Sequence, residues 1–446
     1  MNQASLTSTS ASARAALAAL AALATGLATA APVQAASVSL TVERAVEVAL
    51  RSNPRLAAAR ARVEAGVERA SSSARRLLPV VRLSEELQYY DSAFAVSFPG
   101  SPQSLVAREQ TTNTFVAAVE EPLLGLLRLN SEREAQSAGS EAARAQLAAV
   151  EADLRQAVET QFLRYFEARA LGQIADASAK QLGAEVEVAR ARLTSGVITQ
   201  ADLLRLQVAV ANAHQQSLQA GSQGAVAHAT LFALLGYGAG EPGPTLIEPS
   251  HLLAAARTPP PRLAALLPGA RARRPELVER LRLTDAADGQ ARARGYALLP
   301  EINAEAAYLR VDGQVFAPKN SAYVGLKAQW AIWEWGASER LRRAAEADAS
   351  AARRDLEATD RQVESDLAIS LAQGDAARGA VEAAEAAITS AEEAFRVTQA
   401  QVKAGAATTT DLLEAESALT QARLNLTRSN YELALAHVAL ARAAGN

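Results

Sequence analysis

The turn that decides the fold of this chain reads Ala-Gly-Ala-Ala-Thr-Thr-Thr-Asp-Leu-Leu at residues 404–413. An earlier copy at residues 195–204 reads Ser-Gly-Val-Ile-Thr-Gln-Ala-Asp-Leu-Leu, and the two glycines are 405 − 196 = 209 positions apart. Glycine tolerates the positive φ that ends a helix, and Thr-x-x-Asp can cap the next helix reciprocally. Each copy is therefore predicted to reverse the chain between two helices.

The sequence around each turn predicts a long helical hairpin. Residues 126–195 form a proline-free helical pattern of roughly 70 residues, which would extend about 105 Å at ~1.5 Å per residue. In the last helix the leucines recur every seven residues, which predicts packing of helix on helix. These leucines are Leu412, Leu419, Leu426, Leu433 and Leu440, and the small residues Ala415, Ala422, Ser429 and Ala436 follow the first four by three positions.

A helix and two strands are expected before each hairpin. Strand character covers residues 81–95 and 112–119 around a Pro/Gly/Ser loop at about 97–110, and it returns at 301–311 and 321–333 around a shorter loop. The preceding helices carry Asn53-Pro54 and Arg274-Pro275, at an offset of 275 − 54 = 221. An offset that falls from 221 to 209 between the paired strands indicates a duplication whose copies differ in loop length.

These patterns divide the chain into four segments. Residues 1–35 are predicted to be a signal peptide, because Arg14 precedes an apolar run and Val33-Gln34-Ala35 provides a small-x-small cleavage site; the alternative is an uncleaved anchor helix. The first structural repeat is expected at 36–240, a Pro-rich connector at 241–273, and the second repeat at 274–446.

Composition argues against several classes of function. The chain has 45 Lys and Arg against 48 Asp and Glu, a net charge of −3, which gives no electrostatic case for nucleic acid. With 0 cysteines there can be no disulfide, thiol nucleophile or lipid-modified cysteine. The histidines His214, His228, His251 and His437 lack paired ligand spacing. No metal site, cofactor or catalytic constellation is expected, and the chain is not predicted to be an enzyme.

A membrane location would have to use strands. Beyond the leader no run of about 18 apolar residues is present. Four strands cannot close a barrel, which needs about eight or more, so three chains with twelve strands are the natural count. Trp330, Trp333 and Trp335 cluster at the end of the fourth strand. They suit either an interfacial aromatic girdle or a small core where strand meets helix.

Several motifs, taken in order, resemble the TolC-type outer-membrane channels of tripartite efflux pumps and type I secretion systems. The resemblance covers residues 39–445. It rests on Ala45-x-x-x-Ala49-Leu50-x-x-Asn53-Pro54, Leu77-Leu78-Pro79, Glu121-Pro122-Leu123-Leu124, Gln329-Trp330-Ala331-Ile332-Trp333, the twin Gly-to-Asp-Leu-Leu turns, and the closing Ala-x-x-x-Leu-x-x-Ala-x-Gly.

The resemblance implies a mainly α fold with a small membrane β-barrel portion. Duplicated α-hairpins and four strands per chain would form a homotrimer, with a twelve-stranded barrel continued by an α-helical tunnel. It implies a place in the outer membrane of a Gram-negative cell, extending into the periplasm. The expected partners are outer-membrane lipid, a periplasmic adaptor (membrane fusion) protein and an inner-membrane pump of the RND, ABC or similar type.

The family also implies a pore constriction at the periplasmic tip. The matching acidic residues are Asp411 and Glu414, with Asp202 at the first turn. Around a three-fold axis each would form a ring of like charges that favours cations. Alternatively Asp411 and Asp202 are helix caps, and both roles can coexist. Some relatives carry a basic residue two positions after the second glycine, where this chain has Ala407, so the interactions that lock its tip must differ.

The two turns also match the sites where adaptors dock in this family. The residues concerned are Ser195, Gly196, Val197, Ala404, Gly405 and Ala406; the alternative is that they form exposed turns without a partner. For the whole chain, the competing interpretation is a periplasmic coiled-coil structural or adaptor protein without a barrel. That interpretation explains the heptads but not the paired strands in each repeat.

Overall fold

The computed structural model describes residues 39–100, 102–238 and 243–446, and the predicted signal peptide lies outside them. Contacts divide the chain into two units. The small unit contains β1 (Ser39–Leu40) and β5 (Thr245–Leu246), which pair in parallel with Ser39 opposite Thr245. The large unit holds all the other elements.

Apart from β3, α6 and α7, which were not predicted, the helices and strands of the large unit follow the predicted order. The helices are α2 (Val42–Ser52), α3 (Pro54–Arg75), α4 (Gly125–Thr194), α5 (Gln200–Leu235), α6 (Ser250–Ala256), α7 (Leu263–Arg273), α8 (Pro275–Tyr296), α9 (Ala337–Lys403) and α10 (Thr409–Ala443). The strands are β2 (Val80–Tyr89), β3 (Phe94–Ser97), β4 (Ser104–Pro122), β6 (Glu301–Gln314) and β7 (Asn320–Gln329).

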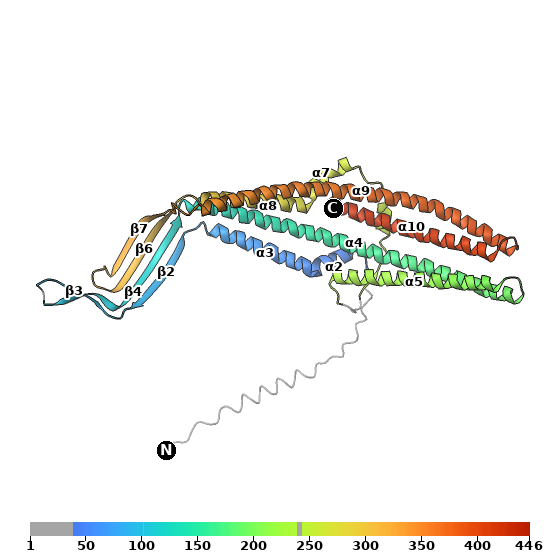
Figure 1. Cartoon of the computed structure of the whole chain (residues 1–446), viewed down its shortest axis with the longest axis horizontal. Coiled ribbons are helices and arrows are strands. Elements are labelled where there is room, and N and C mark those ends of the chain that lie inside the picture. The colour runs from blue at the N-terminus through green and yellow to red at the C-terminus, as the bar shows by residue number, and fades with distance from the viewer. Residues whose placement is uncertain (1–38, 101, 239–242) are drawn as a thin grey trace, which may run out of the picture. The chain divides into compact units, whose positions relative to one another are not determined.

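Two long hairpins, α4–α5 and α9–α10, confirm the prediction from the repeated turn. Helix α4 has 70 residues and α9 has 67. Within this unit the sheet lies at one end of the long helices and both hairpin turns lie at the other (Figure 1). The heptad leucines Leu412, Leu419, Leu433 and Leu440 are buried along α10, so the seven-residue pattern is a packing surface.

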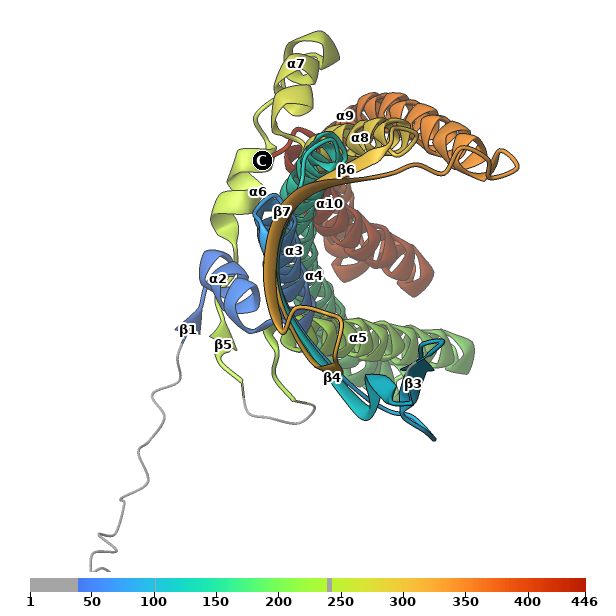
Figure 2. The same cartoon turned by 90° about the vertical axis from the view of Figure 1, so that its left-hand side faces the viewer.

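The main sheet has the order β2-β4-β6-β7, with antiparallel neighbours, and β3 pairs with β4 beside this path. It is curved when viewed from its own end of the unit (Figure 2). The four long strands are those predicted. The sheet leaves one edge of β2 and one edge of β7 unpaired among the described residues.

One expectation about an irregular segment was wrong. The predicted loop at 97–110 is largely a hairpin extension, because Phe94 pairs with Arg108 and Ser97 with Ser104. Val106 and Leu105 supply strand-forming side chains there, opposite Ala95 and Val96. The boundaries of the Pro-rich connector at 241–273 stay a prediction, and its described part contains β5, α6 and α7, with Pro249 as an N-cap and Pro268 inside α7.

The duplication extends to hydrogen bonds that close the last helix of each repeat. In the first repeat Asn53 Nδ2 donates to the carbonyl oxygen of Leu234 at 3.0 Å. In the second, Arg274 Nη1 donates to the carbonyl oxygen of Ala443 at 3.2 Å. The donors differ by 274 − 53 = 221 positions and the acceptors by 443 − 234 = 209. The start of each repeat thus satisfies carbonyls that its last helix leaves unpaired.

A glycine completes both closures, with φ of 84° at Gly236 and 82° at Gly445. A Cβ on Gly445 would lie 2.9 Å from the Cβ of Arg273, and one on Gly236 would lie 3.2 Å from the Cβ and Oγ of Ser52. Both the backbone conformation and the close approach therefore require glycine.

Gly445→Ala is expected to destabilise the protein by about 1–2 kcal/mol, because a left-handed residue with a Cβ is strained and Arg273 must shift. Gly379→Ala is the matched control, since Gly379 lies inside α9 and its added Cβ would meet nothing within 4 Å. The midpoint of thermal unfolding in detergent, followed by circular dichroism, measures both. Equal midpoints for the two variants would show that the closure is not a constraint on stability.

Candidate functional site

The two hairpin turns have the same backbone geometry. Gly196 and Gly405 have φ of 73° and 74°. The N–H of Val197 donates to the carbonyl of Arg192 at 2.9 Å, and the N–H of Ala406 donates to that of Gln401 at 2.8 Å. This six-residue closure is a Schellman helix end. All six residues predicted to meet an adaptor are exposed, so both turns are accessible.

Each turn is followed by a complete capping box. The Oδ2 of Asp202 accepts from the N–H of Thr199 at 3.0 Å, and the Oδ2 of Asp411 accepts from that of Thr408 at 2.7 Å. In return, Thr199 Oγ1 and Thr408 Oγ1 accept from the backbone N–H groups of these aspartates at 3.3 and 3.2 Å. The predicted capping role of both aspartates is confirmed.

The same hydrogen bonds stabilise the ionised carboxylates. They lower the pKa of Asp202, chiefly through the Thr199 hydroxyl, and that of Asp411, chiefly through the Thr408 backbone N–H. Glu414 is exposed one turn further along α10. Negative charge is thus concentrated just after the second turn, and the ring of carboxylates around a three-fold axis stays a prediction.

Arg205, which no sequence pattern had indicated as a site residue, joins the two hairpins near their turns. The Nη1 of Arg205 lies 3.5 Å from Asp202 Oδ1 on its own helix and donates to Thr410 Oγ1 of the other hairpin at 3.1 Å. The i,i+3 spacing to Asp202 could have revealed the first contact, but not the second. Beneath this link Leu413 of α10 packs on a cluster that includes Leu182 and Leu206.

One face of the sheet is apolar and exposed. The paired register places Leu83, Ala117, Tyr308 and Ala322 in one row across the four strands. Other exposed apolar side chains on this face are Val81, Leu87, Tyr89, Val119, Val324 and Leu326. The face also carries Glu85, whose Oε1 accepts from Asn113 Nδ2 at 3.0 Å. An exposed apolar face of this extent suits contact with lipid.

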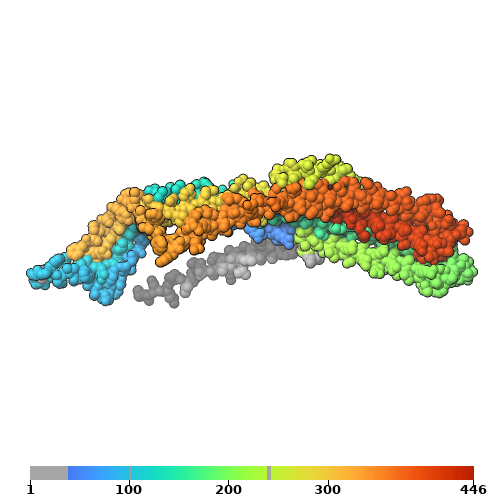
Figure 3. All heavy atoms as spheres, turned by 45° about the horizontal axis from the view of Figure 1, so that its top comes forward, coloured from blue at the N-terminus to red at the C-terminus, as the bar shows by residue number. Residues whose placement is uncertain are grey.

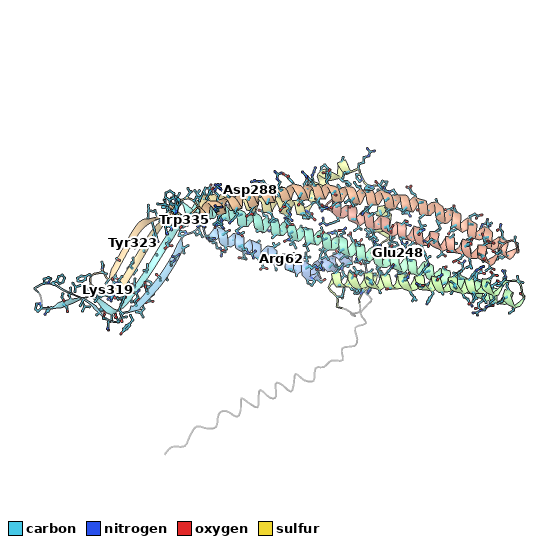
Figure 4. The ribbon with its side chains drawn as sticks, viewed as in Figure 1. Arg62, Glu248, Asp288, Lys319, Tyr323 and Trp335 are labelled. Atoms are coloured by element: carbon cyan, nitrogen blue, oxygen red, sulfur yellow. The ribbon has the colours of Figure 1, made fainter. Side chains whose placement is uncertain are left out.

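The opposite face of the sheet is polar. Arg82, Ser84, Glu86 and Gln88 alternate with the apolar residues of β2. On this face Arg82 lies 3.5 Å from Glu120. Tyr323, labelled on β7 in Figure 4, donates to Glu305 at 2.8 Å. Two faces of opposite character are typical of a sheet that separates lipid from water.

The three tryptophans lie just beyond β7, in the segment that leads into α9 (Trp335 is labelled in Figure 4). Trp330, Trp333 and Trp335 are 60%, 75% and 85% exposed. The alternative of a small buried core is therefore wrong for the single chain, because such exposure leaves most of each indole uncovered. Trp330 Nε1 donates to the carbonyl of Leu298 at 3.3 Å, and the role of the cluster at a membrane interface stays a prediction.

Within the described ranges, no group of three or more His, Cys, Asp or Glu residues is placed to hold a metal ion. None of the helices in this part of the chain is sufficiently long and apolar to cross a membrane.

Comparison with known proteins identifies a family. The family model described as "Outer membrane efflux protein" matches residues 45–237 and 266–446. The outer membrane efflux protein BepC of Brucella suis is 26% identical over 287 residues, which cover 63% of this chain and 61% of that relative's length. Both matches favour a channel over the periplasmic coiled-coil interpretation.

Solved structures share the fold. The match to the CusC structure covers 91% of this chain and 92% of the CusC chain, with a TM-score of 0.78 at 17% sequence identity. The match to VceC of Vibrio cholerae covers 91% of this chain and 96% of the VceC chain, with a TM-score of 0.77 at 18% sequence identity. The match to the open-state MtrE outer membrane channel of Neisseria gonorrhoeae covers 91% of this chain and 89% of the MtrE chain, with a TM-score of 0.74 at 18% sequence identity.

The capping boxes are expected to weaken in acid. A carboxylate with a lowered folded-state pKa contributes stability that is fully present above its ordinary value, here 3.8, and that is lost as the pH falls through the folded-state value. Because the chain has 0 cysteines, a spin label on Val197→Cys would report one turn alone. We expect its mobility to stay constant at neutral pH and to rise below pH 3.8.

Asp202→Asn, added to the labelled chain, is the matched control for this titration. It retains an oxygen that can accept from Thr199 but cannot change its charge, so the acid transition should disappear from the electron paramagnetic resonance spectrum. Persistence of the transition in this variant would assign it to another group.

Proposed function

The chain belongs to the outer membrane efflux protein family, and on this premise we propose that it is the outer-membrane exit duct of a tripartite efflux pump or type I secretion system. The observation that carries the proposal is that one unit has a two-faced sheet at one end and two exposed hairpin turns at the other. A sheet with one apolar and one polar face continues directly into hairpins that end in exposed, capped turns.

The edges of the sheet support assembly into a homotrimer. In lipid each unpaired backbone group costs several kcal/mol, so the free edges of β2 and β7 need partners. Pairing β2 of one copy with β7 of the next would close three sets of four long strands into a twelve-stranded barrel. Outer-membrane lipid would then cover the apolar face, and Trp330, Trp333 and Trp335 would lie at its periplasmic boundary.

At the other end the turns would meet a periplasmic adaptor through Ser195, Gly196, Val197, Ala404, Gly405 and Ala406. Their exposure and their rigid Schellman geometry offer a defined surface for docking. An inner-membrane pump would supply the energy, and the duct would conduct substrate passively without catalysing a reaction.

The constriction would form where Asp411 and Glu414 of three copies approach the axis, with Asp202 nearby. Arg205 is the candidate lock in place of the basic residue that Ala407 replaces. Its contact with Thr410 crosses from the first hairpin to the second, so the two hairpins cannot separate at the tip without breaking it.

The first test is single-channel current from the mature protein in a planar bilayer. We expect cation-selective pores, because rings of carboxylates attract cations. Asp411→Asn with Glu414→Gln removes both charges but keeps oxygens that can accept hydrogen bonds, and it should weaken the selectivity. Glu64→Gln, an exposed carboxylate on α3, is the control and should leave selectivity unchanged.

If the double substitution leaves the cation selectivity unchanged, the proposed duct stands, and Asp411 and Glu414 act only as a helix cap and a surface charge. Absence of pores from a membrane-inserted oligomer would contradict the duct and favour the structural coiled coil.

A second test concerns the lock. Arg205→Ala should raise the ratio of open to closed time by about twofold, since an exposed hydrogen bond contributes about 0.5 kcal/mol. Arg190→Ala is the matched control, because the ion pair of Arg190, at 3.0 Å, is made with Glu187 of its own helix. The same bilayer recordings measure both, and equal open times in the two variants would exclude Arg205 as a lock.

A further inference from the structure

The two long hairpins of the main sheet pair in the same register. Val80 lies opposite Glu120 in the first hairpin, β2–β4, and Glu301 lies opposite Gln329 in the second, β6–β7. These partners are related by the two offsets of the duplication, since 301 − 80 = 221 and 329 − 120 = 209. The second hairpin is therefore a structural copy of the first.

Backbone hydrogen bonds at the other end of each hairpin obey the same rule. The N–H of Tyr90 donates to the carbonyl of Gln110 at 2.7 Å, and the N–H of Val311 donates to that of Lys319 at 2.9 Å. The donors again differ by 311 − 90 = 221 positions and the acceptors by 319 − 110 = 209. The equivalence thus holds along the whole length of the strands.

Inside the chain the two hairpins meet where β4 pairs with β6. Their atoms adjoin at the left of Figure 3, blue to cyan for the first hairpin and yellow-orange for the second. Ala118 lies opposite Ala307, and the N–H of Leu123 donates to the carbonyl of Ile302 at 2.8 Å. Because the two kinds of pair alternate along an antiparallel ladder, Ala118 and Ala307 form a non-hydrogen-bonded pair, in which side chains approach most closely.

The duplication predicts the same contact between two copies of the chain. The free edge of β7 is equivalent to the edge of β4 that meets β6, and the free edge of β2 is equivalent to the edge of β6 that meets β4. Adding 209 to the position of Ala118 gives Lys327, and subtracting 221 from that of Ala307 gives Glu86. Lys327 of one copy would therefore lie directly opposite Glu86 of the next.

The charges fit this register, although the backbone alone defined it. Lys327 and Glu86 are both exposed. Both lie on the polar face of the sheet, since Lys327 follows Tyr323 on β7 by an even number of residues. Among the described residues neither has an ion-pair partner, and Glu86 accepts a hydrogen bond from the neutral side chain of Gln88. Each edge thus carries an unmatched charge of the sign that the other edge needs.

The apolar face fits the same register. Exposed apolar side chains would meet there in two pairs, Leu326 opposite Leu87 and Val324 opposite Tyr89. A slip of one residue would set polar side chains of one copy against apolar ones of the next. A slip of two would place Lys327 opposite the neutral Ser84 or Gln88.

We propose that β7 of one copy pairs with β2 of a second copy in this register, with an ion pair between Lys327 and Glu86 across the contact. Opposite charges directly across two strands stabilise a sheet, and like charges in that position destabilise it. The inference rests on the proposed barrel and names the partner residues of each sheet edge. On the polar face, the ion pair would line the lumen wherever two copies meet.

The first test is a disulfide between copies, for which the chain with its 0 cysteines is suited. Glu86→Cys with Lys327→Cys places one cysteine on each edge of the sheet. Within one chain these edges are three strand spacings apart, about 14 Å, which is beyond the reach of a disulfide. Oxidation of the membrane-inserted protein is therefore expected to give a covalent trimer on a non-reducing denaturing gel.

Two matched controls report the neighbouring registers on the same face. They are Lys327→Cys with Ser84→Cys and Lys327→Cys with Gln88→Cys. In the proposed register these side chains are diagonal neighbours about 7–8 Å apart, so the yield of covalent trimer should be about fivefold lower or less. A higher yield from either control than from the Glu86 pair would overturn the register while leaving the trimer intact.

The failure of this inference is distinct from the failure of the duct. Lack of covalent trimer from all three cysteine pairs, in protein that still conducts in a bilayer, would overturn the pairing of β2 with β7 in this register. Lack of pores from the wild-type oligomer would contradict the duct itself.

Exchange of the charges tests the ion pair. Lys327→Glu sets two carboxylates opposite each other at every contact, and it should lower the temperature at which the trimer dissociates in detergent by about 2–4 °C. Glu86→Lys added to this variant restores opposite charges and should restore the wild-type temperature. Gel electrophoresis without prior boiling measures the dissociation, and equal temperatures for the single and double variants would exclude the ion pair.

Discussion

The large unit depends on the burial of α4. A helix of 70 residues cannot bury its apolar residues alone, and small local propensities do not hold such a length in water. Contacts with α3, α5, α8 and α10 cover it on several sides, including the fully buried Val158, Phe162 and Leu163. The remaining helices therefore pack alongside α4, and the sheet lies at the N-terminal end of α4 (Figure 1).

Duplication supplies those neighbours, but the copies are not chemically equal. The closure of the first repeat uses the neutral donors Ser52 and Asn53. The second uses Arg274, which also pairs with Glu276 and Asp366. Arg442 beside it contacts Glu276 and Asp153, so this closure links α4, α8, α9 and α10. Burial of paired charges favours one arrangement because breaking a pair leaves an uncompensated ion.

The seam between the hairpins is joined more weakly toward the turns. There the links are Arg205 to Thr410 and Ser178 to Glu416, together with the cluster around Leu413. The Arg205–Thr410 hydrogen bond is exposed and neither link is an ion pair, so local opening near the turns requires less free energy than separation near the arginine closure. The proposed duct, which would open at its tip while its middle stays fixed, would need this gradient.

The sequence by itself determined the features set by neighbouring residues: the duplication, the lengths of the hairpins, the glycine helix ends and both capping boxes. These follow from spacing of a few residues and from the backbone freedom of glycine. Only the tertiary structure decided that β3 pairs across the expected loop, that Arg205 reaches Thr410, and that Glu416 is buried against Ser178. The last two contacts join residues 205 and 238 positions apart, and a side chain's partner across such a distance is fixed by how the helices pack rather than by its own sequence neighbours.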